Sequence, residues 1–376
     1  MLAQKLADSF SVTLVPSLHR FRDFDSHEAV YCCRDINSGL IAYIAIHNTA
    51  LGKALGGCRM WDYASDDDAI TDALRLSQGM TYKHAIAGTN MGGGKAVIIG
   101  KPTDKSPELL RSFARFVDAL HGMYVTAEDV GIGVPDVVQM NAETQHIAGL
   151  PVEMGGSGNP SPFTAYGVFC GIQASLAYRQ GNAFAENASM AGTKVLVQGL
   201  GNVGFSLCKH LHSVGAELLV CDPVESRVAE AMSKFKATSV ALEDVYETPT
   251  DVYAPCALGG TLTEQSIASI PCQVVAGAAN NQLATPEVEQ LLHQKGIMYA
   301  PDFVINAGGI INISYENRGY NANLAWEQTR QIGHTLTRVF ETADAESIMP
   351  GQAALRIAQE KLAAPAGVPQ TEKLHN

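Results

Sequence analysis

A glycine-rich stretch that ends in a lysine is the part of the sequence best suited to chemistry. It reads Gly88-Thr89-Asn90-Met91-Gly92-Gly93-Gly94-Lys95, and Lys83 lies just upstream. Consecutive glycines remove side chains from the backbone and allow positive φ, so a substrate or cofactor can lie against the main chain. A lysine in a water-poor cleft loses its proton more readily and can act as a base. The pattern indicates a reaction centre at Lys95, with Lys83 as a second cation able to hold a carboxylate.

Two other interpretations of this stretch remain open at this point. A phosphate-binding loop of the Walker type needs a glycine five positions before its final glycine and a hydroxyl residue directly after the lysine. The sequence has Thr89 and Ala96 at those positions, which disfavours such a loop. A simple glycine turn followed by a solvated lysine is the other interpretation, and only the rest of the chain can decide against it.

Two carboxylates follow a predicted strand further along the chain. They are Glu128 and Asp129, within Val125-Thr126-Ala127-Glu128-Asp129-Val130-Gly131. Charged residues at strand ends commonly carry the chemistry of α/β folds. A helix-capping role for Asp129 fits the pattern equally well.

The second half of the chain contains the pattern of a dinucleotide-binding site. A predicted strand, 194–198, leads at once into a G-x-G-x-x-G loop and a helix, and the next strand, 217–221, ends in an acid. The glycines suit a tight turn against a pyrophosphate, and the acid suits the ribose hydroxyls. The residues predicted to bind the cofactor are Gly199, Gly201, Asn202, Val203, Gly204 and Asp222. The acid favours NAD over NADP, although Arg227 is near enough to leave NADP open.

The elements around these sites alternate between strands and helices, which predicts an α/β fold. We expect a hairpin over 28–35 and 40–47, a helix from Ser65 to about Lys83, a short buried strand over 96–99 and a helix over 108–120. The clearest break in composition is 151–162, which is rich in glycine and proline and predicts a domain junction.

Composition excludes several classes of protein. The 376 residues are 46% apolar and 17% charged, which is typical of a soluble globular chain with two domains. A net charge of −12 argues against nucleic acid or an anionic membrane as a partner. The eight cysteines form no C-x-x-C pair and do not cluster with histidines, so no metal site is expected. Residues 1–18 have no signal-peptide pattern and no apolar run could span a membrane, so a cytoplasmic location is expected.

Several motifs in one order resemble a known family. From about Glu28 to Tyr320 the chain resembles the amino-acid dehydrogenases that act on glutamate, leucine, phenylalanine and valine, and within them most closely the leucine dehydrogenases. The matching blocks are Leu55-Gly56-Gly57-Cys58-Arg59-Met60-Trp61, Met80-Thr81-Tyr82-Lys83, Gly92-Gly93-Gly94-Lys95, Thr126-Ala127-Glu128-Asp129-Val130-Gly131, Gly158-Asn159-Pro160-Ser161-Pro162, Ala254-Pro255-Cys256-Ala257-Leu258-Gly259 and Asn306-Ala307-Gly308-Gly309.

The resemblance implies NAD-dependent oxidative deamination of an L-amino acid to its 2-oxo acid, with release of ammonia. It implies that Lys83 holds the substrate carboxylate, that deprotonated Lys95 activates the water that attacks the imine, and that Asp129 moves protons to and from the amine nitrogen. Two cations close to one glycine stretch would favour the loss of a proton from one lysine, which agrees with these roles.

The resemblance also suggests which side chain the substrate carries. Glutamate enzymes of the family place a lysine directly before the Gly-Gly pair, whereas this chain has Leu55, and a carboxylate buried opposite leucine would cost several kcal/mol. The residues implied to surround the substrate are Leu55, Gly56, Gly57, Met80, Lys83, Ala127, Ile310 and Ile313. Two isoleucines should narrow the pocket and favour leucine, valine or isoleucine. Phenylalanine and tryptophan enzymes share most of this framework, so an aromatic substrate remains an alternative.

The resemblance further implies an architecture and partners. We expect residues 1–150, joined by C-terminal helices from about 340–376, to form an α/β domain for substrate binding, catalysis and oligomerisation. Residues 151–339 should form a Rossmann-type doubly wound domain across a cleft from it. Thr164, Asn280 and Asn306 join the cofactor-binding residues, and the family is typically oligomeric, as a dimer or an octamer.

Two functions from other classes compete with this interpretation. One is a non-catalytic regulator that senses NAD, which would have no reason to keep Lys83, Lys95 and Asp129 together. The other is a pyridoxal-phosphate enzyme with Lys95 as its Schiff base, against which the dinucleotide pattern argues.

Overall fold

The chain folds into two compact units, each with its own sheet. The computed structural model describes residues 10–316 and 319–364. The first unit runs to Leu150 and resumes at Arg356, and the second occupies the chain between them. The N-terminal residues 1–9, which belong to the segment predicted to lack a signal peptide, lie outside the described residues. So do the last residues of the C-terminal segment that was expected to join the first unit.

Near the C-terminus the chain returns to the first unit at Arg356, later than the expected boundary at about residue 340. The helix α12 (Ala322–Glu346) packs against α5 (Ser161–Arg179) within the second unit. This packing keeps α12 in the second unit, and the division falls inside α13 (Pro350–Ala363).

The first unit is built on a six-stranded mixed sheet. Its strands are β1 (Phe10–Leu14), β2 (Ala29–Asp35), β3 (Leu40–Asn48), β4 (Ala54–Trp61), β5 (Gly92–Ile99) and β6 (Tyr124–Ala127). Their order across the sheet is β1-β2-β3-β5-β4-β6. The pairs β1–β2, β2–β3 and β3–β5 are antiparallel, whereas β4 runs parallel to both β5 and β6. The predicted hairpin is confirmed by the pairing of β2 with β3, and its turn contains Gly39 at φ +73°.

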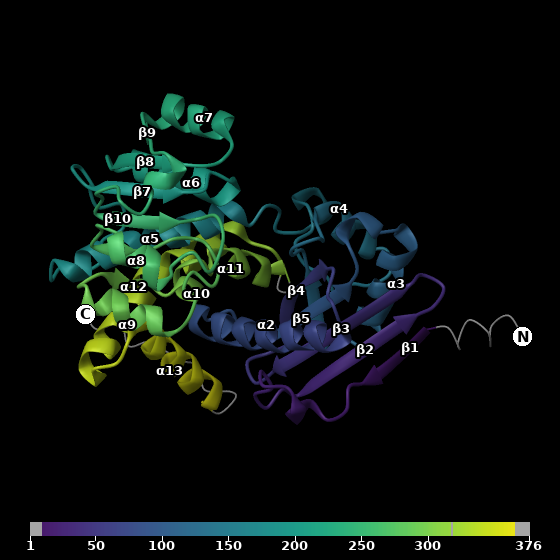
Figure 1. Ribbon diagram of the computed structural model, residues 1–376. Coiled ribbons are helices and arrows are strands. Elements are labelled where there is room, and N and C mark those ends of the chain that lie inside the picture. Colours follow the sequence, from purple (N-terminus) through teal and green to yellow (C-terminus); the bar gives the residue numbers. More distant parts are fainter. Residues whose placement is uncertain (1–9, 317–318, 365–376) are drawn as a thin grey trace, which may run out of the picture. The chain divides into compact units, whose positions relative to one another are not determined.

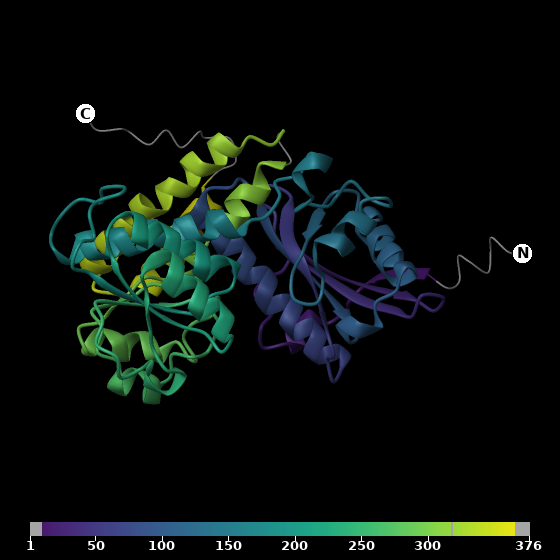
Figure 2. The same ribbon diagram turned by 90° about the horizontal axis from the view of Figure 1, so that it is seen from above.

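Helices cover both faces of this sheet (Figures 1 and 2). They are α2 (Asp66–Ala87), α3 (Pro107–Asp118) and α4 (Val134–Met140), with short 3-10 turns at Leu18–Arg20 and Pro102–Asp104. On one face Ile70 and Leu74 of α2 pack against Tyr43 and Val97 of the sheet. The opposite face packs against the buried residues of α3, among them Phe113.

Local sequence signals explain the limits of α2. The Ser65 side chain accepts a hydrogen bond from the Asp68 backbone N–H at 3.1 Å, and three aspartates lie in the first turn, where the helix dipole favours negative charge. The helix runs past Lys83, its expected end, to Ala87. It ends there because Gly88 adopts the left-handed conformation at φ +67°.

The second unit is built on a six-stranded sheet in which all five strand pairs of the described residues are parallel. Its strands are β7 (Lys194–Gln198), β8 (Glu217–Cys221), β9 (Thr238–Ser239), β10 (Val252–Pro255), β11 (Val274–Val275) and β12 (Met298–Tyr299). The order is β12-β11-β10-β7-β8-β9, so the chain starts at the centre and winds outward in both directions (Figure 1). This is the predicted doubly wound, Rossmann-type arrangement, and the α/β fold class is confirmed.

Helices connect most strands of the second unit and also lie before its first strand and after its last. Besides α5 and α12 they are α6 (Asn202–Ser213), α7 (Glu225–Phe235), α8 (Glu264–Ser269), α9 (Glu287–Gln294), α10 (Asp302–Ile305) and α11 (Gly308–Ser314), with 3-10 turns at Val152–Met154 and Leu242–Asp244. Tyr253 in the sheet, Ile267 of α8 and Leu292 of α9 share one buried core. Among the helices of the described residues, none has the length and apolar character needed to cross a membrane.

Buried histidines make the first unit sensitive to acid. His27 is 6% exposed, and its Nε2 donates to the Leu74 carbonyl at 3.0 Å. Burial lowers the pKa of His27 to about 4 and that of His84 to about 3. Both rings are therefore neutral in the folded protein, whereas the unfolded chain binds their protons below about pH 6.5. Stability should be fully present above that pH and should fall as the pH drops towards 4.

We predict that His27→Gln makes the free energy of unfolding less dependent on pH. Both proteins should lose free energy of unfolding between pH 6.5 and pH 4.5. The loss should be larger in the wild type, by on the order of 2 kcal/mol. Urea unfolding at a series of pH values measures the difference. The exposed His19, replaced in the same way, is the control and should keep the wild-type slope. An unchanged slope in His27→Gln would contradict the prediction.

Candidate active site

The predicted lysine and the predicted acid form an ion pair in the first unit. Lys95 lies on β5 and Asp129 lies two residues beyond the end of β6, and the Lys95 Nζ is 2.7 Å from the Asp129 Oδ2. The Lys95 side chain is 7% exposed and the Asp129 side chain 23%. Lys95 lies in a buried strand, and α4 begins only after its N-cap Gly133, which lies four residues beyond Asp129. The solvated-lysine and helix-cap interpretations are therefore not the ones that the structure adopts.

An arginine that was not predicted as a site residue completes this cluster. The Arg59 Nε donates to the same Asp129 Oδ2 at 3.2 Å, and its Nη1 donates to the Asp72 Oδ2 at 3.0 Å. A signal for Arg59 exists in the sequence, because it is the one charged residue in the strand Ala54–Trp61, and a charge in a largely buried strand requires a partner. The sequence does not say which acid would provide it.

The electrostatics of the cluster favour an ionised Asp129. Burial raises the pKa of the Asp129 carboxyl, but the charges of Lys95 and Arg59 outweigh burial and hold the pKa below its ordinary value. The adjacent Glu128 differs, since burial and then the charge of Asp129 both raise the pKa of its carboxyl. Of the two strand-end carboxylates, Asp129 is thus the one that the neighbouring cations keep ionised.

The three glycines before Lys95 have a different role from the one expected. They were expected to leave the backbone bare for a ligand, but Gly92, Gly93 and Gly94 are buried residues of β5, and positive φ is not found at any of them. A Cβ on Gly93 would lie 2.0 Å from the Thr81 Oγ1 of α2. The glycine lets α2 lie directly against β5, two residues before Lys95.

This close packing positions the helix that carries Met80 and Lys83. Both residues are half-buried on α2, where Met80 precedes Thr81 and Lys83 follows Tyr82. The charge of Lys83 contributes to the lowered pKa of its neighbour His84, after the larger effect of burial. Arg59 is a second cation at Asp129 beside Lys95, and the role expected of Lys83 stays a prediction.

The predicted substrate-binding residues of β4 and β6 lie beside the ion pair. Gly57 packs so closely that a Cβ would lie 2.9 Å from the Asp129 Cβ, and a Cβ on Gly56 would lie 1.8 Å from the Gly94 carbonyl oxygen. Leu55 is 2% exposed and Ala127 is 5% exposed. The His84 Nε2 donates to the Leu55 carbonyl at 3.2 Å, which fixes this end of β4 against α2.

The predicted dinucleotide loop has the expected local structure in the second unit. It connects β7 to α6, and Gly199 adopts φ +95°, a conformation that favours glycine. A Cβ on Gly204 would lie 1.9 Å from the Gly199 carbonyl oxygen, so the third glycine is needed for α6 to start this close to the strand. A Cβ on Gly201 would meet nothing within 4 Å, so the backbone there borders open space. Asn202 and Val203 form the first turn of α6.

Asp222, the acid at the end of β8, is hydrogen-bonded to this loop. The Asp222 Oδ2 accepts a hydrogen bond from the Leu200 backbone N–H at 2.7 Å, and its Oδ1 accepts one from the Val224 backbone N–H at 2.8 Å. The Arg227 Nη1 is 3.7 Å from the Asp222 Oδ1. A cavity of about 570 Å³ adjoins the loop and is lined by Gly201, Asn202, Lys209 and Arg227 among others.

The remaining cofactor candidates lie on other elements of the second unit. The Asn306 Nδ2 donates to the Asn280 Oδ1 at 2.9 Å and to the Ala278 carbonyl at 3.1 Å. The Asn306 Oδ1 is buried and has no hydrogen-bond partner in the structure. The Thr164 hydroxyl donates to the Pro160 carbonyl at 3.2 Å in the first turn of α5, where it packs against Gly309.

These residues fit a dinucleotide. The loop offers open space at Gly201, an N-terminal helix turn suited to a pyrophosphate, and an acid suited to ribose hydroxyls. The unpaired, buried Asn306 Oδ1 can accept a hydrogen bond from an amide such as that of a nicotinamide. Ile310 and Ile313, predicted to line the substrate pocket, lie on α11 of this unit, half-buried and buried respectively.

Comparisons with known proteins place the chain in a family. Residues 27–146 match the family described as Glu/Leu/Phe/Val dehydrogenase, dimerisation domain, and residues 222–364 match the Glutamate/Leucine/Phenylalanine/Valine dehydrogenase family. The chain is 47% identical to leucine dehydrogenase of Geobacillus stearothermophilus, over 92% of this chain and 93% of that protein. It is 45% identical to valine dehydrogenase of Streptomyces virginiae, over 90% of this chain and 95% of that protein.

A solved structure is also similar. The crystal structure of L-tryptophan dehydrogenase from Nostoc punctiforme superposes with a TM-score of 0.80 at 42% identity, covering 90% of this chain and 96% of that one. The resemblance inferred from the motifs is confirmed, and the relatives act on different amino acids. The chain therefore belongs to the Glu/Leu/Phe/Val dehydrogenase family and is an NAD(P)-dependent amino-acid dehydrogenase.

Proposed function

We propose that the protein catalyses the reversible, NAD-dependent oxidative deamination of a branched-chain L-amino acid, with leucine preferred, to the 2-oxo acid and ammonia. The observation that carries the proposal is the ion pair between buried Lys95 and partly buried Asp129, at 2.7 Å, beside the glycines of β4. Bound NAD would accept the hydride from the α-carbon of the amino acid. The remaining steps move protons and bind the substrate, and these fall to residues of this chain.

In this proposal each polar residue has one task. Lys83 binds the substrate carboxylate, and the half-buried position of its side chain on α2 supports a charged contact with a small ligand. Asp129, whose pKa lies below its ordinary value, accepts a proton from the substrate ammonium group and later returns one to the departing ammonia. Lys95 gives up its proton as the substrate binds and then activates the water that attacks the imine carbon. That proton leaves to solvent, because Asp129 carries the proton taken from the substrate, and neutral Lys95 then takes a proton from the attacking water.

The choice of side chain rests on the apolar residues near this pair. Leu55, Gly56 and Ala127 present no charge that could pair with a distal carboxylate, which argues against glutamate. Met80 lies close to Gly56, since its Cγ is 3.5 Å from the position of a Cβ there. The similarity to leucine and valine dehydrogenases supports a branched-chain substrate. The roles of Ile310 and Ile313 as further substrate contacts stay predictions from the sequence.

The cofactor preference rests on Asp222. A 2′-phosphate next to its carboxylate would bring like charges together, which costs several kcal/mol, whereas a ribose 2′-hydroxyl can donate to it. We also propose a homo-oligomer, a dimer or an octamer, because residues 27–146 match a domain described as a dimerisation domain.

The first prediction concerns the ion pair. Lys95→Ala and Asp129→Asn should each lower kcat for leucine by at least about 10²–10⁴-fold, because each removes a proton-transfer group. Binding of NADH, followed by its fluorescence, should persist. The matched control is Lys105→Ala, which breaks another Lys–Asp pair of the first unit, with the Lys105 Nζ 2.6 Å from the Asp136 Oδ2. Near-normal turnover in Lys95→Ala or Asp129→Asn would remove that residue from the mechanism.

The second prediction concerns the substrate. Among leucine, valine, phenylalanine, tryptophan and glutamate, kcat/KM should be highest for leucine, and one methylene group should change it by about 10–200-fold. Ile310→Ala should raise the ratio of kcat/KM for phenylalanine to that for leucine. Ile36→Ala, at a residue that is 81% exposed in a turn, is the control and should leave the ratio unchanged. A preference of the wild-type enzyme for tryptophan or phenylalanine would refute the narrow pocket.

The third prediction concerns the cofactor. The wild-type enzyme should use NAD with a kcat/KM at least about a hundred times that for NADP, because like charges oppose the 2′-phosphate. Asp222→Asn removes the charge and should reduce this ratio about ten-fold. Glu225→Gln, at an exposed acid three residues later, should keep the wild-type ratio. Equal use of both cofactors by the wild type, or an unchanged ratio in Asp222→Asn, would argue against the role of Asp222.

A further inference from the structure

We propose that Arg59 is a positioning residue for the Lys95–Asp129 pair, and that Asp72 and Tyr63 hold it in place. The inference rests on the proposed function, because it assigns Arg59 a task in the proton transfers of that pair. Arg59 lies on β4, which pairs with β5, the strand of Lys95, and with β6, which ends two residues before Asp129.

The contacts of Arg59 point in two directions from one planar group. Its Nε binds the Asp129 Oδ2 at 3.2 Å and its Nη1 binds the Asp72 Oδ2 at 3.0 Å. A guanidinium has donors in a fixed geometry, so the position of Asp72 sets the direction from which Arg59 approaches Asp129. A lysine has a single nitrogen and could not bind both acids in this geometry.

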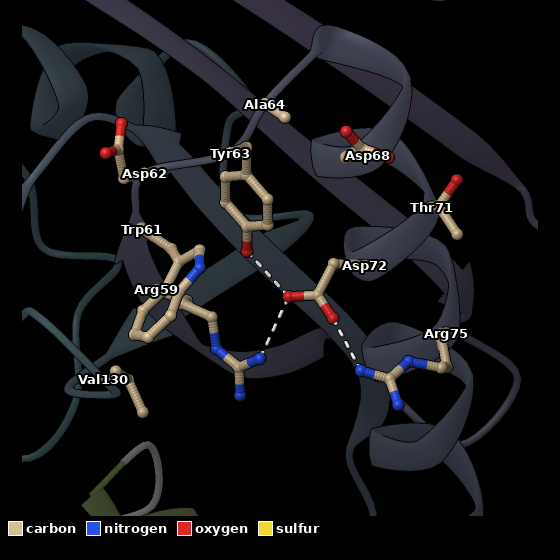
Figure 3. Close-up of a pocket in the computed structure, with 10 residues that line it drawn as sticks. All are labelled: Arg59, Trp61, Asp62, Tyr63, Ala64, Asp68, Thr71, Asp72, Arg75 and Val130. Atoms are coloured by element: carbon tan, nitrogen blue, oxygen red, sulfur yellow. Dashed lines mark hydrogen bonds and ion pairs between the residues drawn. The ribbon is translucent and has the colours of Figure 1, made fainter.

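Asp72 is itself fixed from two sides. The Tyr63 hydroxyl donates to its Oδ2 at 2.7 Å, and the Arg75 Nη2 donates to its Oδ1 at 2.8 Å. Figure 3 shows Tyr63, Arg59 and Arg75 converging on this carboxylate. The Asp72 side chain is 13% exposed, and the hydrogen bonds with the charges of Arg59 and Arg75 outweigh burial, so its pKa is lowered and it remains ionised.

The arrangement restricts which oxygen of Asp129 does the chemistry. Lys95 and Arg59 both bind Oδ2, at 2.7 Å and 3.2 Å. Two cations on one carboxylate oxygen keep the group in a single orientation. The Asp129 Oδ1 is then the oxygen that can face a substrate amine. Without Arg59 the carboxylate could rotate about its χ2 bond, and a misplacement of about 1 Å can cost about 10²-fold in rate.

The groups that act on Asp129 allow a test by pH. In the described residues they are Lys95, Arg59, Cys58, Tyr63, Tyr124 and Glu128, and Asp72 reaches it through Arg59. Burial raises the pKa of Cys58, Tyr63 and Tyr124, which keeps these three neutral at ordinary pH. Removing the Arg59 charge should therefore raise the pKa of Asp129. Activity that needs the ionised form should then fail at a higher pH than in the wild type.

Arg59 can also be reached by a small ion. Its side chain is 24% exposed and borders a surface cavity of about 560 Å³, which Trp61, Tyr63 and Asp72 also line (Figure 3). A guanidinium ion that diffuses into the cavity of a variant without Arg59 can occupy the vacated position between the two acids.

The test compares Arg59→Gln, Arg59→Lys and Asp72→Asn in the full-length enzyme. Arg59→Gln should lower kcat for leucine about ten- to a hundred-fold, should move the acid limb of kcat/KM to higher pH, and should recover activity in millimolar guanidinium. Arg59→Lys keeps the charge and should keep the acid limb. Asp72→Asn should lower kcat without moving the limb to higher pH, because it disturbs the position of Arg59 but not its charge. Arg111→Gln, at an exposed arginine that pairs with Glu108, is the control and should match the wild type.

The outcomes separate this inference from the proposed function. Thermal unfolding and NADH binding show which variants are folded, and Arg59→Lys provides the pH comparison if Arg59→Gln does not fold. If Arg59→Gln keeps kcat within about two-fold of the wild type, or if kcat falls with no shift of the acid limb and no rescue, Arg59 does not position the pair. If Lys95→Ala and Asp129→Asn remain active, the proposed function itself fails, whatever Arg59 does.

Discussion

An ion pair between buried Lys95 and partly buried Asp129 is the contact on which the proposed site depends. A buried charge without a partner is costly, so the surrounding elements have to keep both groups in place. Glycines serve this purpose, because Gly93 lets α2 lie against β5 and Gly57 lets Asp129 lie against β4. The same packing that stabilises the sheet therefore presents a cation and an acid together at one position.

The second unit solves a different problem, which is to hold an anionic cofactor without a large excess of positive charge. Backbone N–H groups at the start of α6 and the conformation of Gly199 form the loop proposed to bind it. The Asp222 carboxylate accepts a hydrogen bond from this loop at Leu200, so the residue expected to recognise the ribose also fixes the loop that would bind the phosphates.

The sequence predicted what depends on local pattern. The loop from Gly199 to Gly204 was predicted correctly because its glycine spacing encodes a backbone conformation within six residues, and the hairpin of β2 and β3 follows from a turn. Lys95 and Asp129 were singled out one by one, and only the family resemblance joined them. The contacts of Arg59 with Asp72 and Asp129 were missed, because they link residues far apart in sequence through the order of the strands. The glycines before Lys95 were misinterpreted, since their close neighbour Thr81 belongs to another element.

The central claim is that Asp129 is ionised and paired with Lys95 before the substrate binds. Infrared spectroscopy of enzyme labelled with [13C]aspartate, with Asp129→Asn as the reference for assignment, measures the protonation of this carboxyl directly. Because the pKa of Asp129 lies below its ordinary value of 3.8, the account predicts a carboxylate band that stays constant from pH 5 to pH 8 and a band shift in Lys95→Ala. A protonated Asp129 that titrates within this range in the wild-type enzyme would contradict the account.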